Sequence, residues 1–153
     1  MEIILNCDLV IASPTSTFGL PEAQSGLYAS GGGLPRLLHT VGLPIAGDMA
    51  LTVRRFSASD ALRFSLISRI SETPESVLDE ALETAESVAA ISPDAIIMTR
   101  AALREAWETA GVERAFQLTH ESYDDKLMKG FNAQEGLAAF KEKRTPIWQA
   151  FKL

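Results

Sequence analysis

The sequence has few of the residues that build the commonest active sites. A single cysteine among 153 residues excludes an internal disulfide and a cysteine-rich zinc site. Its apolar neighbours predict that this residue, Cys7, is a buried small hydrophobe rather than a reactive thiol. The two histidines, His39 and His120, are far apart and offer little to a metal centre or a Ser-His-Asp hydrolase. We therefore expect no metal site.

The chain also lacks a surplus of positive charge and a long apolar run. Fourteen Lys and Arg stand against 20 Asp and Glu, which gives a formal net charge of −6. Binding along DNA or RNA requires basic residues that neutralise phosphates, so we expect no nucleic-acid partner. No apolar run is long enough for a transmembrane helix and no secretory signal is visible, so we expect no membrane partner. Mitochondrial, peroxisomal and cytoplasmic locations all stay open.

What is present is an ordinary globular composition, 46% hydrophobic and 22% charged, at a length typical of one domain. The run 7–12 is short and β-prone, and 18–22 is long enough only for a strand fragment. Four glycines within Ser25–Gly33 predict a loop that lets a ligand approach the backbone closely. Residues 66–70 alternate in polarity and predict another strand.

The remaining signals are mostly helical. We expect a helix from Leu34 that is interrupted near Gly42–Pro44, and a capping box in which Ser57 pairs with Asp60. Helix starts are predicted at Thr73-Pro74 and at Ser92-Pro93. The helix that begins at Thr73-Pro74 has an apolar stripe that predicts a core face, formed by Leu78, Ala81, Leu82, Ala85, Val88 and Ala89.

Two further helices are expected near the C-terminus. One runs from about Val112 to Met128, and the other begins with a capping box of Asn132 and Glu135 and ends at Pro146. The strands lie at the front and are too few to close a sheet. The sequence therefore predicts part of a larger α/β unit, with short strands in residues 1–72 and helices in residues 73–153.

Two glutamates are distinguished by their surroundings. Glu2 and Glu22 are each the only acid in an apolar or glycine-rich stretch. A carboxylate in such surroundings holds its proton more tightly, and a pair of them can divide acid and base roles. Solvent-exposed residues with no role are the alternative interpretation.

The order of motifs resembles the crotonase (enoyl-CoA hydratase/isomerase) superfamily. The resemblance is carried by Met1–Ala12, by Phe-Gly-Leu-Pro-Glu at 18–22, by the glycine-rich loop with Leu-Pro-Arg at 34–36, and by the tail Glu135–Trp148. It covers nearly the whole chain and implies the C-terminal portion of a crotonase-like α/β fold. Residues 1–72 would form the active-site segment and residues 73–153 the helical region that caps coenzyme A and forms trimers.

The resemblance implies an enoyl-CoA hydratase, a lyase that adds water syn across a 2-trans-enoyl-CoA. Glu2 matches the glutamate that orients and activates the water, and Glu22 matches the one that exchanges a proton with the substrate α-carbon. No cofactor is implied, because coenzyme A is part of the acyl-CoA substrate. Having both glutamates favours a hydratase over an isomerase.

The resemblance also implies a set of substrate-binding residues. Ser30 stands where family hydratases often have a glycine near the catalytic water, and Gly31 begins the tight loop that acyl-CoA would pass. Phe140 and Lys143 match positions that hold the nucleotide of coenzyme A, often from a neighbouring subunit. A polar loop residue at Ser30 and a surface cation at Lys143 are the alternatives drawn from the residues alone. Relatives commonly form trimers or dimers of trimers, which implies a homotrimer or hexamer.

One part of the family pattern is not found in this sequence. The resemblance implies two backbone N–H donors to the thioester oxygen, one far upstream and one in a Gly-Gly-Gly run before the position of Met1. We therefore expect an incomplete chain with little activity, since losing one such donor costs ~10²–10³ in rate. We also expect the free amino group of Met1 to pair with Glu2. The alternative function is a catalytically silent fragment that acts through oligomer or partner contacts.

Overall fold

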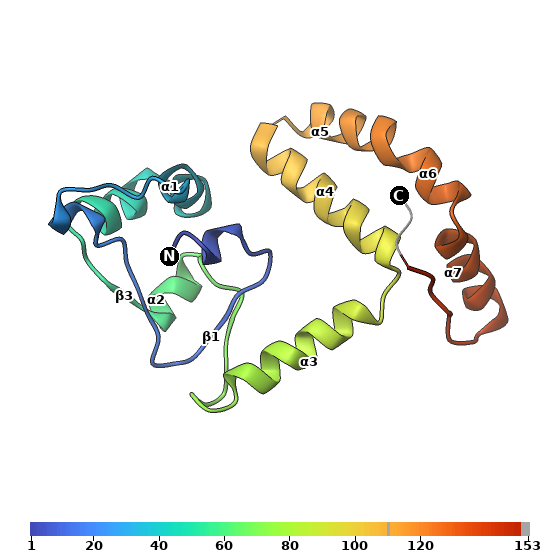
Figure 1. The fold of residues 1–153 in the computed structure, drawn as a ribbon, viewed down its shortest axis with the longest axis horizontal. Coiled ribbons are helices and arrows are strands. Elements are labelled where there is room, and N and C mark those ends of the chain that lie inside the picture. Colours follow the sequence, from blue (N-terminus) through green and yellow to red (C-terminus); the bar gives the residue numbers. More distant parts are fainter. Residues whose placement is uncertain (110, 151–153) are drawn as a thin grey trace. The chain divides into compact units, whose positions relative to one another are not determined.

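The structure is a computed structural model that describes residues 1–109 and 111–150. The chain forms two compact units, Met1–Glu83 and Thr84–Leu153 (Figure 1). The boundary between them lies inside helix α3 (Val77–Ala89), eleven residues after the division at 72/73 that the sequence predicted.

The first unit contains four strands of two residues each, paired into two small sheets. Strand β1 (Ile11–Ala12) runs parallel to β4 (Arg69–Ile70), and β2 (Thr17–Phe18) runs antiparallel to β3 (Phe56–Ser57). The predicted strands at 7–12 and 66–70 are thus realised only at their last two residues. A 3₁₀-helix, η1 (Ile4–Asn6), lies directly before the first of these two segments.

The helices of the first unit follow the sequence signals closely. Helix α1 (Gly33–Leu51) is broken at Gly42, whose φ of 76° lies in the left-handed region, as predicted. Helix α2 (Ala58–Arg63) begins with the predicted capping box, in which the Asp60 amide donates to Ser57 Oγ over 3.2 Å. That hydroxyl also donates to the Asp60 carboxylate and lowers its pKa. A second 3₁₀-helix, η2 (Glu22–Ser25), precedes the glycine-rich loop.

The hydrophobic core of the protein lies in the first unit. Its buried side chains come from the strands, from α1 and α2, and from the segments between them, and Leu20, Leu37 and Met49 are almost wholly inaccessible. This core fixes the two ends of the segment from Leu20 to Leu37, which contains Glu22 and the glycine-rich loop.

The second unit is helical. Helix α4 (Pro93–Thr109) begins at the predicted Ser92-Pro93 signal, and α5 (Val112–Thr119) folds back alongside it (Figure 1). A π-helical turn, η3 (His120–Asp124), leads into α6 (Asp125–Lys129), so the predicted helix of 112–128 is continuous but locally widened. Helix α7 (Phe131–Glu142) follows and contacts both α4 and α6.

Polar side chains, rather than large apolar ones, are buried in the second unit. Asn132 is 2% exposed and donates from Nδ2 to Asp94 Oδ2 over 2.8 Å and to the Gln149 carbonyl over 3.0 Å. The predicted capping box of Asn132 and Glu135 is therefore wrong. Gly130 is the N-cap of α7, and no side chain caps that end of the helix.

Two further expectations are wrong in this structure. Cys7 is exposed, and its Sγ donates to the Ile3 carbonyl over 3.6 Å. The apolar stripe of α3 is not a core face, since Leu78 and Leu82 are 65% and 53% exposed and α3 has no buried residue. The start of α3 also differs. Thr73 and Ser76 cap each other as a reciprocal pair, but the α-helix begins only at Val77.

None of the helices in the described part of the chain combines the length and the apolar character that crossing a membrane requires.

Candidate active site

The carboxylate of Glu2 lies against the glycine-rich loop. The amide of Gly33, the first residue of α1, donates to Glu2 Oε1 over 3.1 Å. The first N–H groups of a helix have no partner within the helix, so a carboxylate at this place completes the helix terminus and is itself stabilised. The predicted pair between Glu2 and the Met1 amino group does not form; the Gly33 amide is the partner instead.

The carboxylate packs closely against two glycines, and a side chain on either one would displace it. A Cβ on Gly31 would lie 2.7 Å from Glu2 Oε2, and a Cβ on Gly33 would lie 2.8 Å from Glu2 Cγ. Both distances are shorter than real Cβ contacts allow. The loop and the acid are thus one fitted arrangement, although 31 positions separate Glu2 from Gly33.

Arg36 holds the loop from the other side. Its Nη1 donates to the Gly32 carbonyl over 3.1 Å, and Gly32 has a φ of 85°, which a residue with a side chain rarely adopts. A Cβ on Gly32 would also overlap Arg36 Nη1. The Nε of Arg36 is buried and has no hydrogen-bond partner among the described residues. The loop geometry is therefore set by α1, from which Arg36 projects.

Glu22, unlike Glu2, has a carboxylate oxygen, Oε2, that is buried without a hydrogen-bond partner among the described residues. The residue opens η2 and is half-buried. Its main-chain carbonyl accepts from the Gly26 and Leu27 amides, which fixes the backbone of η2. A buried carboxylate oxygen without a partner is rare in proteins and calls for an explanation.

The four predicted substrate-binding residues fall into the two units. Ser30 and Gly31 are exposed in the first unit, on the loop that contacts Glu2. Phe140 and Lys143 lie in the second unit, near the end of α7. The Phe140 ring is 86% exposed, and Lys143 is the exposed residue that ends the helix.

Two residues to which the sequence analysis gave no role also contact the candidate site. Gly33 donates to Glu2, and Arg36 holds Gly32. The signal for Gly33 was present in the unbroken Gly-Gly-Gly run. Nothing in the sequence indicated that Arg36 would turn back to the loop.

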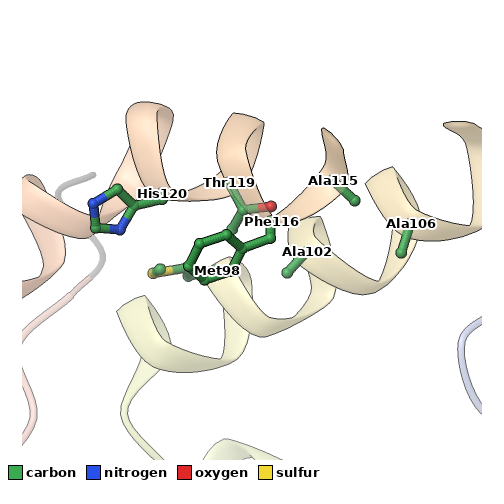
Figure 2. Close-up of a pocket in the computed structure, with 7 residues that line it drawn as sticks. All are labelled: Met98, Ala102, Ala106, Ala115, Phe116, Thr119 and His120. Carbon is green, nitrogen blue, oxygen red and sulfur yellow. The ribbon is translucent and has the colours of Figure 1, made fainter. Parts of the chain in front are cut away.

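A separate pocket of about 280 Å³ lies between α4 and α5 and contains none of the predicted site residues (Figure 2). Met98, Ala102 and Ala106 line it from α4, and Ala115, Phe116 and Thr119 line it from α5. The Phe116 ring stacks on His120 at 5.9 Å between ring centroids. Within residues 1–109 and 111–150, no group of three or more His, Cys, Asp or Glu side chains could hold a metal ion.

Comparison with solved structures identifies the fold. An enoyl-CoA hydratase structure from Geobacillus kaustophilus HTA426 superposes with a TM-score of 0.88 at 30% identity, over 98% of this chain and 57% of that one. An enoyl-CoA hydratase/isomerase from Mycobacterium paratuberculosis gives the same TM-score at 33% identity, over 97% of this chain and 58% of that one. The chain therefore has part of the crotonase fold, as predicted.

Sequence comparison gives the family. The model of the enoyl-CoA hydratase/isomerase family matches residues 1–150, and the chain belongs to this family. Mevalonyl-coenzyme A hydratase sidH of Aspergillus fumigatus is 42% identical over 99% of this chain and 56% of its own length. Carnitinyl-CoA dehydratase of Proteus mirabilis is 33% identical over 97% of this chain and 57% of its own. The chain thus spans somewhat more than half the length of these relatives.

Proposed function

We propose that this protein is an enoyl-CoA hydratase-like lyase in which Glu2 and Glu22 act together on one water molecule. Glu2, held by the Gly33 amide, would orient and activate the water. Glu22 would take one proton from this water and pass it to the α-carbon of the thioester, while the remaining hydroxide adds to the β-carbon. Both the hydroxyl and the proton come from the water, so the two carboxyl groups end the cycle as they began it.

The observation that carries this proposal is the buried, unpartnered Oε2 of Glu22. A carboxylate oxygen in that state suits a group whose partner is a bound water or substrate rather than another part of the chain. Glu2 is anchored and Glu22 is not, which suits a division between an orienting and a proton-transferring acid. We assign no donor to the thioester oxygen among the described residues.

We propose a coenzyme A thioester as the substrate. Ser30 and Gly31, in the first unit, would contact the acyl end of such a ligand, and Phe140 and Lys143, in the second unit, would contact the nucleotide of one. The named relatives support this class, since hydration or dehydration of a CoA thioester is common to them. Mevalonyl-CoA and a short straight-chain 2-enoyl-CoA are the first two substrates to compare. No cofactor beyond the substrate is part of the proposal.

The test is substitution of the proton-transferring acid in the protein at the length that its source produces. We expect Glu22→Gln to lower kcat about 10²–10⁴-fold, followed as loss of the enoyl-thioester absorbance, with the Kd for coenzyme A little changed. Glu75→Gln, an exposed acid of the same unit, is the matched control and should retain full activity. Undiminished turnover by Glu22→Gln would remove Glu22 from the mechanism.

We also propose that the protein assembles as a homotrimer or hexamer. The exposed apolar stripe of α3, with Leu78 and Leu82, supports burial against another subunit. We expect light scattering to give a mass of three or six chains, and Leu78→Glu with Leu82→Glu to lower it. A protein that assembles in this way but neither binds nor converts a CoA thioester would favour the catalytically silent alternative.

A further inference from the structure

The segment after α7 folds back along that helix. We call residues 144–150 the C-terminal strap. Arg144 and the Ile147 amide bind Glu135, the Trp148 ring lies on Gly136, and Gln149 bonds to Asn132. The strap thus contacts α7 over several of its residues, from Asn132 to Gly136. The contacts all fall on the helix face that includes the buried residues Asn132 and Ala139.

The chain reverses direction at Lys143. Its φ of 56° and ψ of 38° place it in the left-handed region. The Arg144 amide donates to the Ala139 carbonyl over 3.1 Å and the Lys143 amide to the Phe140 carbonyl over 3.3 Å, which together form a Schellman motif. Glycine is the usual residue at this position, and lysine is disfavoured there, so contacts outside the turn must help to hold it.

Glu135 supplies the strongest of these contacts. Its side chain is 11% exposed, and its two oxygens accept from Arg144 Nη1 and Nη2 over 2.6 and 2.9 Å. Oε1 also accepts from the Ile147 amide over 2.8 Å. A two-fold Arg–carboxylate contact fixes direction as well as distance. Because Arg144 is the next residue after Lys143, this contact fixes the peptide that orients Lys143.

We propose that Glu135 is a positioning residue for coenzyme A binding, acting through Arg144 to hold Lys143 in its left-handed, solvent-facing conformation. This inference rests on the proposed binding role of Lys143. The Arg144 side chain is engaged by Glu135, while the side chains of Lys143 and Phe140 are exposed and accessible to a ligand. Holding the backbone at Lys143 in place before the ligand arrives fixes the direction in which its side chain leaves the turn, and so reduces the ordering cost of binding.

The experiment measures coenzyme A binding by calorimetry, and KM and kcat for the thioester, in the protein at its native length. We expect Lys143→Ala to weaken binding about 10-fold or more, as for loss of a charged hydrogen bond. Glu135→Gln should weaken it by a similar factor and raise KM with kcat unchanged. The double variant should bind no more weakly than Lys143→Ala, because Glu135 acts through that residue.

Glu142→Gln is the matched control. Glu142 also accepts from Arg144, through Nε only, and its side chain is 59% exposed, so little change in binding is expected. Arg144→Lys keeps the charge but loses the two-fold contact, and should give an intermediate loss if Glu135→Gln does not fold.

The outcomes separate the two proposals. No effect of Lys143→Ala would overturn the proposed role of Lys143 itself. A strong effect of Lys143→Ala with none of Glu135→Gln or Arg144→Lys would overturn only the positioning role. Additive losses in the double variant would also overturn it, since Glu135 would then act by stabilising α7 in general.

Discussion

Glu2 and the glycines that surround it show how closely one side chain can depend on residues far along the chain. The carboxylate position is set by one amide, that of Gly33, and by the absence of side chains at Gly31 and Gly33. The acid could be chosen from the sequence because its context was unusual. Its partner, the Gly33 amide, could not be predicted from the sequence. A contact between residues 31 positions apart depends on how the loop and α1 pack, and no local sequence pattern encodes that packing.

The first prediction concerns this fit. We expect Gly33→Ala to lower kcat about 10²-fold, because a Cβ at 3.0 Å from Glu2 Oε1 must displace the carboxylate that we propose orients the water. Steady-state hydration kinetics measure the effect. Gly47→Ala in the same helix is the control, since its Cβ would meet nothing closer than 4.0 Å. Equal activity of the two variants would show that the position of Glu2 does not matter for turnover.

At the scale of elements, the sequence correctly predicted a helix start and a helix break that depend only on residues close together in the chain. The capping box of Ser57 and Asp60 and the break of α1 at Gly42 both form as expected, because each is decided by local hydrogen bonds and backbone angles. The same pattern at Asn132 and Glu135 failed. Asn132 donates to Asp94 of α4, and Glu135 accepts from the Ile147 amide of the strap. These partners, distant in sequence, replace the local cap.

The contact between Glu135 and Arg144 predicts that the stabilisation of α7 by the strap depends on pH. The side-chain hydrogen bonds from Arg144, followed by that from the Ile147 amide, lower the pKa of Glu135 from 4.5 to about 2. A lowered pKa in the folded state means that the ionised form stabilises the fold. This stabilisation should be complete above about pH 4.5 and be lost as the pH falls towards 2.

The measurement is the difference in the free energy of unfolding between the wild-type protein and Glu135→Gln across that range. The difference should shrink steadily as the pH falls, because protonated glutamate and glutamine are alike in lacking charge. Glu142→Gln, at the other carboxylate that Arg144 contacts, again serves as the control. A difference that does not vary with pH would contradict the assigned pKa.

At the scale of the whole molecule, the two units are stabilised in different ways. The first has a hydrophobic core that includes Leu37, Met49 and Phe56. Among the described residues of the second, the only buried hydrophobic side chains are Ala115 and Ala139. The sequence predicted a core face on α3, but an apolar stripe shows only which side of a helix is apolar and not whether another element covers it.

We therefore expect the two units to unfold separately in denaturant. Both tryptophans, Trp107 and Trp148, belong to the second unit, so their fluorescence reports on that unit alone, while far-ultraviolet circular dichroism reports on both. Alanine burial contributes little hydrophobic free energy, so the fluorescence transition should come at the lower denaturant concentration. Coincident curves would mean that the two units unfold as one.

The ion pair of Arg144 also bears on how long the chain survives among proteases. A trypsin-like enzyme recognises arginine by drawing its guanidinium onto an aspartate at the base of a pocket. The guanidinium of Arg144 already makes hydrogen bonds to two carboxylates of its own chain. Recognition of Arg144 by such an enzyme therefore requires these hydrogen bonds to break first, so cleavage after Arg144 should be slow while the strap is folded.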